Sequence, residues 1–366
     1  MKIAMIGCKG IPTRYGGVER HVEEVSICLA QKKDYQVYVY ARPYYTFKNT
    51  KKYKGVNIIN LYSLATKHLD AITHSFLASL HAIFILKTDV FHYHAIGPAW
   101  CIWVPKILAP SKKIIFTFHC RDYFHQKWGR LARFSLKFGE VMGCFLADDI
   151  ITVSPELKEY VRDVYHREAT FIPHGSTKEK ILTPKIIKKW NLKKNNYILV
   201  VSRLIRHKGI HYLIKAYQNI KPDKKLVIVG PSFYTADYER ELKEMTAGDK
   251  NIIFLGAQKG KALKELYSNA YTFVSPSEIE GFPLVVIEAA AFGRSLLLSN
   301  IRPHTDMFAK LPFFFKNKNI KDLEKKLRFV LDEPALISER AREIKNYSQE
   351  HYNWHSIVDK TVLKYT

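Results

Sequence analysis

The sequence predicts an α/β protein made of two successive doubly wound domains that face each other across a cleft. Short runs rich in β-branched and aromatic residues alternate with helical patterns along almost the whole chain. Such alternation is typical of parallel sheets covered by helices on both faces. The alternation stops once, near the middle, and then starts again. A chain of 366 residues is also too long for one ordinary hydrophobic core and suits two.

The first series of elements occupies residues 1–180 and predicts the N-terminal domain. Its strands are expected at 2–7, 36–40, 56–61, 90–94, 113–119, 149–153 and 170–172. Helical patterns lie between them at 18–31, 73–86, 129–145 and 155–165. Residues 176–196 are rich in Lys, Thr and Asn and include Pro184. They interrupt the alternation, so we interpret them as the link between the domains.

The second series occupies residues 181–347 and predicts the C-terminal domain. Its strands are expected at 197–202, 225–229, 251–255, 271–276 and 295–299. Its helices are expected at 209–219, 238–246, 261–268 and 284–292. Residues 348–366 are expected to form a C-terminal helix that packs back on the N-terminal domain. Because doubly wound sheets bind ligands at the carboxyl ends of their strands, the loops at those ends are the places to look for a site.

The chain is strongly basic, with 58 Lys and Arg residues against 34 Asp and Glu residues and a net charge of +24. A positive field of this size attracts anions. The net charge is compatible with binding to nucleic acid, to an anionic membrane surface or to a diphosphate ligand. It is equally compatible with a lysine-rich surface that binds only water.

Five scattered cysteines form no CxxC pair and no metal-ligand spacing, which favours reduced thiols in the cytoplasm. No secretory signal is expected, because the apolar run at 3–6 is too short for one. The most apolar long stretch, 71–86, is shorter than the roughly 20 apolar residues of a membrane span. The protein is therefore expected in the cytoplasm, and any contact with the inner face of the plasma membrane is expected to be peripheral.

The most specific motif contains two glutamates, Glu280 and Glu288, with seven residues between them. Its first residues after Glu280 are Gly281, Phe282, Pro283 and Leu284, which lie at the start of a predicted helix. Backbone N–H groups at a helix N-terminus suit a phosphate, and a carboxylate accepts hydrogen bonds from sugar hydroxyls. Taken alone, the spacing also fits two glutamates on an ordinary surface helix.

Basic residues gather at the turn that follows the strand 197–202. Arg203 can bind phosphate through its guanidinium fork, Lys208 adds a point charge, and Arg206 is a third candidate. In isolation, such residues are more often solvated than functional.

A glycine-rich turn with Gly16 and Gly17 follows the first strand and lets backbone approach a phosphate or sugar closely. It matches neither the dinucleotide fingerprint nor a P-loop. His119 ends another predicted strand, at the edge where ligands bind. Both features have structural explanations as well, a turn that needs positive φ and an ordinary core histidine.

No Asp-x-Asp motif and no cluster with metal spacing is present in the sequence. We therefore expect no metal and no cofactor, and a departing diphosphate would have to be neutralised by Arg, Lys and helix N-termini.

Together and in this order, these motifs resemble the retaining glycosyltransferases of family 4, which have the GT-B fold of two Rossmann-like domains. The resemblance covers nearly the whole chain. It rests on Gly-Gly-Val-Glu-Arg-His at 16–21, Ala-Asp-Asp-Ile-Ile-Thr-Val-Ser at 147–154, Ile-Pro-His-Gly at 172–175, Ser-Arg-Leu…Lys-Gly at 202–209, Ile-Val-Gly at 228–230, Phe-Leu-Gly at 254–256 and Pro-Ser…Glu-Gly-Phe…Glu-Ala at 276–289. Residues 126–133 and 136–140 also resemble a bacterial surface-polysaccharide subgroup. The sequence departs from the family pattern at Cys120, at His174 and at Ser295 after Arg294.

The resemblance implies a role for each matching position. Arg203 and Lys208 would bind the donor diphosphate, and Glu288 the ribose hydroxyls. Glu280 and the amides of 282–284 would hold the transferred sugar. Gly16 and Gly17 would lie beside the diphosphate and the acceptor, His119 would reach the donor sugar, and the loop after Gly256 would receive the base.

The resemblance also implies a retaining, metal-independent hexosyltransferase of polysaccharide biosynthesis. Its donor would be a nucleotide diphosphate-sugar, with UDP favoured and GDP next, and its acceptor a glycan or a polyprenyl-diphosphate-linked sugar. The N-terminal domain would bind the acceptor and the C-terminal domain the donor. An anionic membrane surface is a further expected partner, whereas nucleic acid is not.

Two other classes compete with this interpretation. A nucleotide-sugar epimerase can share the fold and would need no acceptor. A basic nucleic-acid-binding protein would explain the charge of +24 but not Glu280 and Glu288, because carboxylates repel a phosphate backbone. A phosphorylase would need a pyridoxal-phosphate lysine, for which no motif is present.

Overall fold

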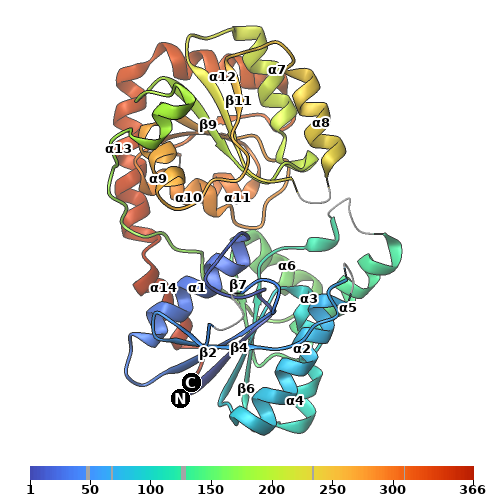
Figure 1. Ribbon diagram of the computed structural model, residues 1–366. Helices are drawn as coiled ribbons and strands as arrows, with labels where there is room; N and C mark the ends of the chain where they lie inside the picture. Colours follow the sequence, from blue (N-terminus) through green and yellow to red (C-terminus); the bar gives the residue numbers. More distant parts are fainter. Residues whose placement is uncertain (47–49, 67–68, 125–128, 233–234, 309) are drawn as a thin grey trace. The chain divides into compact units, whose positions relative to one another are not determined.

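The computed structural model describes residues 1–366 except 47–49, 67–68, 125–128, 233–234 and 309. The chain forms two compact units, both of which are α/β (Figure 1). Unit 1 contains Met1–Gly175 and Trp354–Thr366, and unit 2 contains Ser176–Asn353. The divisions therefore fall at 175/176 and 353/354, and not at the expected 180/181 and 347/348.

Unit 1 is built on an eight-stranded sheet with the order β3-β4-β2-β1-β5-β6-β7-β8. All neighbouring strands run parallel except the short hairpin of β3 and β4. The strands are β1 Lys2–Ile6, β2 Gln36–Ala41, β3 Lys52–Tyr53, β4 Val56–Asn60, β5 Val90–His94, β6 Lys113–Phe118, β7 Asp149–Thr152 and β8 Thr170–Phe171. The hairpin strand β3 is an element that the sequence pattern did not predict.

Seven α-helices belong to the described part of unit 1. They are α1 Gly17–Ala30, α2 Asp70–His81, α3 Ile96–Ala99, α4 Trp103–Leu108, α5 Arg130–Leu146, α6 Pro155–Tyr165 and α14 Trp354–Val362. The expected helix 73–86 is two elements, since α2 passes into a π-helical turn at Ala82–Leu86.

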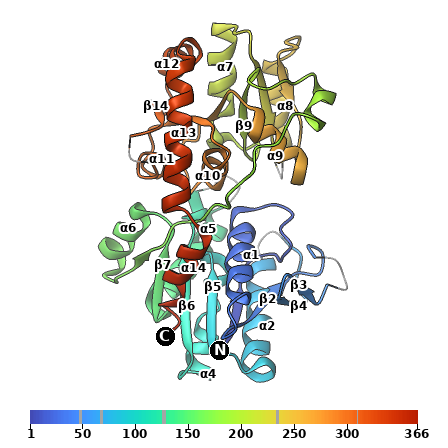
Figure 2. The same ribbon diagram turned by 90° about the vertical axis from the view of Figure 1, so that its left-hand side faces the viewer.

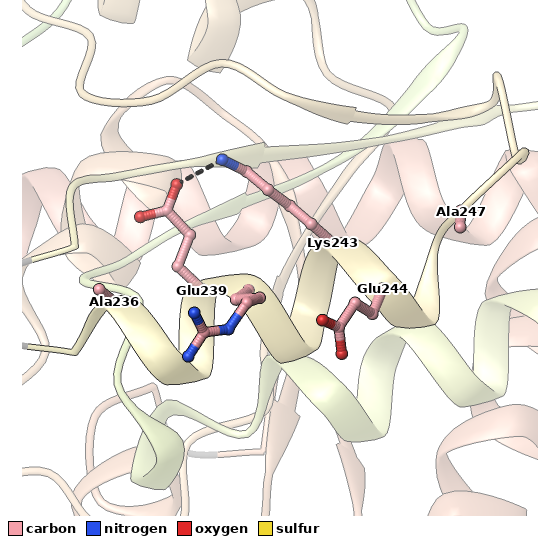
Figure 3. Close-up of a pocket in the computed structure, with 6 residues that line it drawn as sticks. Ala236, Glu239, Lys243, Glu244 and Ala247 are labelled. Atoms are coloured by element: carbon pink, nitrogen blue, oxygen red, sulfur yellow. Dashed lines mark ion pairs between the residues drawn. The ribbon is translucent and has the colours of Figure 1, made fainter.

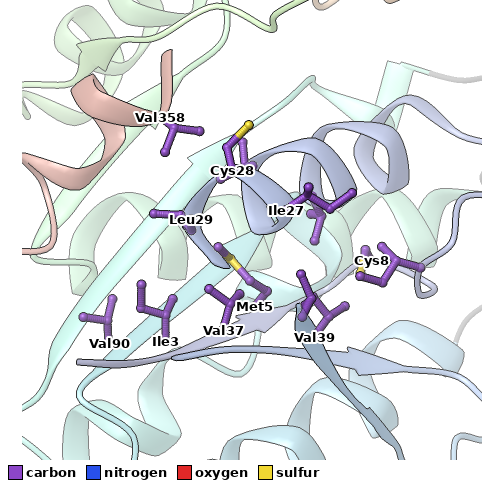
Figure 4. Close-up of a cluster of buried hydrophobic side chains, with 14 of the residues drawn as sticks. Ile3, Met5, Cys8, Ile27, Cys28, Leu29, Val37, Val39, Val90 and Val358 are labelled. Carbon is purple, nitrogen blue, oxygen red and sulfur yellow. The ribbon is translucent and has the colours of Figure 1, made fainter. Parts of the chain in front are cut away.

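One core of unit 1 lies between its sheet and the helices α1 and α14. Figure 4 shows Ile27 and Leu29 of α1 above Ile3 and Met5 of β1, with Val358 of α14 beside them. Figure 2 shows α14 running next to α1. Because Trp354, Ile357, Val358 and Tyr365 are all buried in this core, the C-terminal helix is part of the first unit.

Unit 2 has a six-stranded, fully parallel sheet with the order β11-β10-β9-β12-β13-β14. Its strands are β9 Tyr197–Val201, β10 Lys225–Val229, β11 Ile252–Phe254, β12 Thr272–Ser275, β13 Ser295–Ser299 and β14 Phe313–Phe315. Its helices are α7 Ile210–Ile220, α8 Ala236–Met245, α9 Gly260–Asn269, α10 Leu284–Ala291, α11 Arg302–Thr305, α12 Ile320–Asp332 and α13 Pro334–His351.

Two hydrophobic clusters cover the two faces of this sheet. Side chains of α9, α10 and α13 form one cluster, and side chains of α7, α8 and α12 form the other. The expected link at 176–196 is part of this packing, because the Glu265 carboxylate accepts hydrogen bonds from the N–H groups of Lys185, Ile186 and Ile187. Tyr352 is buried in the first cluster, which is why unit 2 extends past 347.

Candidate active site

The strand order of unit 2 reverses between β9 and β12, and the predicted donor residues follow these two strands. From β9 the chain moves to β10 and β11 on one side and then returns to β12 on the other. Ligands of doubly wound sheets bind at the carboxyl ends of strands at such a reversal. The segment 202–209 follows β9, and the segment 276–283 follows β12. The two motifs therefore meet at the edge of the sheet where a ligand is expected.

Backbone contacts hold the two segments together. The Glu278 N–H donates to the carbonyl oxygen of His207 at 2.7 Å. Gly209 has a φ of +67°, and a Cβ at this position would lie 2.0 Å from the carbonyl oxygen of Pro276. Only glycine allows this approach, so the Lys-Gly pair at 208–209 places the lysine against the segment after β12.

Lys208 and Glu280 form an ion pair between the segments. Lys208 Nζ lies 2.5 Å from Glu280 Oε1, and the two side chains are only 13 % and 9 % exposed. Ser277 Oγ donates to the same carboxylate oxygen at 2.7 Å. Burial would raise the pKa of the Glu280 carboxyl, but the charge of Lys208 and the hydrogen bonds from Lys208 and Ser277, together with His304 once it is protonated in acid, lower it to about 2. Glu280 is therefore an anion that is fixed in place.

His304 lies beside this pair and was not predicted from the sequence. It is fully buried on α11, and its Nδ1 donates to the carbonyl oxygen of Ser299 at 2.9 Å. Burial lowers the pKa of His304 to about 4, although the Glu280 carboxylate opposes the shift. The imidazole is consequently neutral at pH 7.

Glu288 lies on α10 and is oriented by a tyrosine that the motif does not contain. Tyr267 on α9 donates its hydroxyl to Glu288 Oε2 at 3.1 Å. Its ring is 1 % exposed and stacks on Phe292, with centroids 5.5 Å apart and planes at 6°. Burial, together with the nearby Glu288 charge, raises the pKa of Tyr267 well above its usual value, so the phenol remains a donor.

The start of α10 supplies backbone donors near the two glutamates. Its N-cap residue, Pro283, makes no side-chain cap hydrogen bond. The first N–H groups of a helix have no partner within the helix and carry the positive end of its dipole. Phe282 meets Tyr352 edge to face at 5.9 Å, which anchors the segment 281–284 to the core of unit 2.

The basic residues after β9 have different environments. Arg206 forms an ion pair with Glu241, and its guanidinium lies 5.2 Å from the Tyr238 ring centroid. The Arg203 side chain is exposed and has no hydrogen-bond or ion-pair partner within the described residues. Arg203 is thus available to a ligand, whereas Arg206 is engaged with α8.

The loop after β11 reaches the same edge through Gly256. The Gly230 N–H donates to the carbonyl oxygen of Gly256 at 2.8 Å. Gly230 itself has a φ of +148°, and a Cβ there would lie 1.7 Å from the carbonyl oxygen of Ser202. Backbone atoms of the segments that follow β9, β10 and β11 therefore meet at Gly230.

The glycine-rich loop of unit 1 is fixed by side chains that were not predicted. Glu23 Oε2 accepts from the Thr13 N–H at 2.6 Å. The Tyr45 hydroxyl accepts from the N–H groups of Arg14 and Tyr15 at 2.8 and 3.0 Å and donates to the carbonyl oxygen of Tyr15.

The loop ends in glycine because Gly16 has a φ of +109°, a backbone conformation that residues with a side chain rarely adopt. The Glu19 carboxylate accepts from the Lys9 N–H at 3.2 Å and lies beside Gly16. Gly17 is the first residue of α1. The residues Gly16 and Gly17 thus lie in a rigid turn after β1.

His119 follows β6 as predicted, but it is not an isolated histidine. It is 4 % exposed and packs against His21, His94 and His174, with ring centroids 5.0, 5.5 and 5.3 Å away. Burial, followed by the charges of neighbouring histidines, lowers the pKa of His119 well below its usual value. Next to it, Cys120 Sγ donates to Asp122 Oδ1 at 3.0 Å.

A hollow along α8 is lined by Ala236, Glu239, Arg240, Lys243, Glu244 and Ala247 (Figure 3). Glu239 and Lys243, one turn apart on α8, pair with each other at 2.8 Å. It contains none of the predicted site residues. The structure thus brings Lys208 and Glu280 together at one edge of unit 2 and places Glu288 on the helix α10 that follows, while Gly16, Gly17 and His119 belong to unit 1.

Comparison with known proteins identifies both halves of the chain. Residues 15–179 match the family model described as Glycosyltransferase Family 4. Residues 183–351 match the model described as Glycosyl transferases group 1.

The curated relatives are similar over different lengths. An uncharacterized glycosyltransferase of Methanocaldococcus jannaschii is 28 % identical, over 82 % of this chain and 81 % of its own. The O-antigen chain mannosyltransferase RfbU of Salmonella typhimurium is 31 % identical, over 51 % of this chain and 50 % of its own. An N,N'-diacetylbacillosaminyl-diphospho-undecaprenol alpha-1,3-N-acetylgalactosaminyltransferase of Campylobacter jejuni is 28 % identical over 48 % and 46 %. The chain therefore spans about half the length of the latter two.

Solved structures show the same fold. Sucrose-phosphate synthase from Thermosynechococcus elongatus has a TM-score of 0.84 at 22 % identity, covering 100 % of this chain and 98 % of its own. Anabaena HepE in complex with UDP-glucose has a TM-score of 0.80 at 16 % identity, covering 99 % of both chains. With two parallel-sheet α/β units and two glycosyltransferase family matches, the chain belongs to the family 4-type glycosyltransferases with the GT-B fold.

Proposed function

We propose that this glycosyltransferase moves a sugar from a nucleotide diphosphate-sugar to a glycan or polyprenyl-diphosphate-linked acceptor, with retention of configuration and without a metal. The observation that carries the proposal is the buried Lys208–Glu280 pair at the strand-order reversal of unit 2. The UDP-glucose complex of HepE supports a UDP-sugar as the donor. A GDP-sugar is the second candidate of the proposal. The names of the Salmonella and Campylobacter relatives support a surface-glycan or undecaprenol-linked acceptor.

The main requirement of this reaction is that the negative charge on the leaving diphosphate is stabilised. Breaking the anomeric bond leaves negative charge on the phosphate and positive charge on the sugar. Lys208, Arg203 and the N-terminus of α10 supply positive charge for the diphosphate. Groups that are fixed before the reaction stabilise such charge most effectively, and Lys208 is fixed by Glu280.

The two glutamates bind the transferred sugar and the ribose of the donor. Glu280 is held as an anion and accepts hydroxyl groups of the transferred sugar, together with the amides of 282–284. Glu288, oriented by Tyr267, accepts the ribose hydroxyls, and the loop after Gly256 receives the base. On the side of unit 1, His119 reaches the donor sugar, and Gly16 and Gly17 lie beside the diphosphate and the acceptor.

The acceptor is deprotonated by the leaving phosphate on the same face of the sugar, so no side chain acts as a nucleophile. The pKa of Glu280 supports this route, because a carboxyl with a pKa of about 2 is a weak general base at pH 7. The configuration of the product then equals that of the donor.

A donor screen tests the proposal. UDP, GDP, ADP and their sugars are titrated calorimetrically, and the product of the best donor is examined by NMR for its anomeric configuration. We expect a uridine nucleotide to bind with the highest affinity, an α-linked product from an α-linked donor, and full activity in EDTA. An inverted product or no nucleotide binding would contradict the proposal.

The acceptor side includes a membrane-facing helix in this proposal. No described helix is both long and apolar enough to cross a bilayer. On α5, however, Leu131 and Phe134 are 83 % and 72 % exposed, and Arg130 and Arg133 are exposed beside them. Apolar and cationic side chains on one helix suit the surface of an anionic membrane, where a polyprenyl-linked acceptor would be found.

Vesicle sedimentation tests this surface. The protein is expected to sediment with vesicles containing phosphatidylglycerol at low salt and to remain in solution with neutral vesicles. Leu131→Ser with Phe134→Ser should abolish binding, whereas Leu363→Ser, equally exposed at 72 %, should not. Equal binding by all variants would place the contact elsewhere.

A further inference from the structure

Four buried histidines of unit 1 meet at the carboxyl edge of its sheet. His94 ends β5, His119 follows β6, His174 follows β8 and His21 lies on α1. None is more than 4 % exposed. The proposed transfer reaction gives a role to His119 alone, so the other three histidines have no assigned function.

The spacing of three of them suits a metal ion. One nitrogen from each of His21, His94 and His119 lies within 4.8 Å of the others, in a group that stands out among the described residues. His94 Nδ1 and His119 Nε2 are 3.3 Å apart. Two nitrogen ligands at about 2.0–2.1 Å from a tetrahedral zinc ion are separated by about 3.3 Å.

The fourth histidine holds one of the others in place. His174 Nδ1 lies 2.7 Å from His21 Nδ1. This hydrogen bond occupies Nδ1 of His21 and leaves its Nε2 for an ion. Ligand imidazoles in metal sites are commonly fixed by such a bond through their second nitrogen.

The remaining nitrogens of the pair are buried without partners. His94 Nε2 and His119 Nδ1 have no hydrogen-bond partner among the described residues. An ion bound by His94 Nδ1 and His119 Nε2 would place the proton of each ring on these second nitrogens, so the tautomers of both rings would become fixed.

We propose that His21, His94 and His119 bind a transition-metal ion that prefers imidazole, with Zn²⁺ as the physiological candidate, and that His174 orients His21. The binding does not rest on the proposed function. A consequence does: because His119 is proposed to serve the donor sugar, a bound ion would occupy it and inhibit transfer. This is an inhibitory site in an enzyme whose reaction needs no metal.

Cobalt spectroscopy on untagged, EDTA-dialysed protein tests the binding. We expect one Co²⁺ per chain with the strong visible bands of a tetrahedral nitrogen site, and Zn²⁺ should displace it. His94→Gln and His119→Gln should each weaken Zn²⁺ binding by on the order of 100-fold, and His174→Gln by about 10–100-fold. His211→Gln is the matched control, since His211 is also buried, at 8 %, but lies in unit 2.

Several results would overturn the site. They are a cobalt spectrum of hydrated ions only, Zn²⁺ binding weaker than millimolar in the wild type, or unchanged binding in folded His94→Gln and His119→Gln. Circular dichroism verifies folding, and if one variant fails to fold, the other and His21→Gln decide. Zn²⁺ should inhibit transfer by the wild type and not by His94→Gln. If no transfer is found at all, the proposed function fails while the cobalt spectrum still decides the metal site.

Discussion

Replacement of Lys208 by Met gives the sharpest test of the donor site, because the lysine neutralises a buried carboxylate. In the folded protein the pKa of Glu280 is about 2, against an ordinary value of 4.5. At about 1.4 kcal/mol per pKa unit, this depression corresponds to roughly 3 kcal/mol of stability. The sign follows from the direction of the shift. A depressed carboxyl contributes its stability above pH 4.5 and loses it as the pH falls toward 2.

Lys208→Met removes the main favourable charge and leaves Glu280 buried at 9 % exposure. We expect a loss of about 3 kcal/mol in the free energy of unfolding at pH 7. Burial then dominates and raises the pKa of Glu280 above 4.5, so the mutant can protonate this residue in mildly acidic buffer. The difference from wild type should therefore shrink between pH 7 and pH 5.

The double variant Lys208→Met with Glu280→Gln separates stability from binding. It contains no buried charge, so most of the lost stability should return. UDP affinity should remain about 10- to 100-fold below that of wild type, because a hydrogen bond to a charged group is missing. Urea unfolding followed by circular dichroism and calorimetric titration with UDP measure the two quantities. The reasoning would be refuted if the free energy of unfolding of Lys208→Met at pH 7 lay within about 0.5 kcal/mol of the wild-type value, which is about half the contribution of a typical hydrogen bond. A double variant that is as unstable as Lys208→Met would refute it as well.

Three further predictions concern residues that hold the three predicted motifs in place. Tyr267→Phe keeps the ring stacking but removes the donor to Glu288, so UDP affinity should fall about 10-fold in calorimetry, and an unchanged affinity would contradict the role of Tyr267. Gly230→Ala places a Cβ 1.7 Å from a carbonyl oxygen and should cost more than about 3 kcal/mol in urea unfolding, whereas Gly248→Ala, at φ +83° with open space around it, should cost about 1–2 kcal/mol. Tyr45→Phe removes the acceptor for two loop amides, so hydrogen exchange of the Arg14 and Tyr15 amides should accelerate about 10-fold, and equal exchange rates would show that Tyr45 does not hold the loop.

The sequence predicted the parallel-sheet elements well because their periodicity is local. Most of the predicted strands agree with the observed strands to within two residues, as β10 and β13 show. The segments 202–209 and 276–283 lie directly after the strands β9 and β12, as the sequence predicted, and their role in donor binding stays a prediction. The strand β14, Phe313–Phe315, was missed because three consecutive aromatic residues show no alternation.

The division of the chain could be predicted only approximately. The single helix expected at 348–366 contains the end of α13 and all of α14, and nothing local reveals that Tyr352 packs on unit 2 while Trp354 packs on unit 1. The segment 176–196 is polar enough to indicate a linker, yet Glu265 binds its backbone from 78 to 80 residues away along the chain. Such contacts are decided by tertiary packing.

The residues that support the site could not be predicted for the same reason. Tyr267 and Glu288 are 21 residues apart, and Tyr45 and Arg14 are 31 apart. His21, His94, His119 and His174 show no metal-ligand spacing because each comes from a different element. A signal existed in hindsight only for His94 and His119, which both end predicted strands that turn out to be neighbours in the sheet.

The C-terminal helix α14 imposes an order on the synthesis of this protein. Translation produces the sheet of unit 1 first and then all of unit 2, and only afterwards the residues Trp354, Ile357, Val358 and Tyr365 that complete the first core. While unit 2 emerges from the ribosome and folds, the surface of α1 that α14 covers remains uncovered. Unit 1 is therefore synthesised first, but its core is completed only after unit 2 has been made. A chain truncated at residue 353 would lose part of the core of unit 1, although the rest of that unit ends at Gly175.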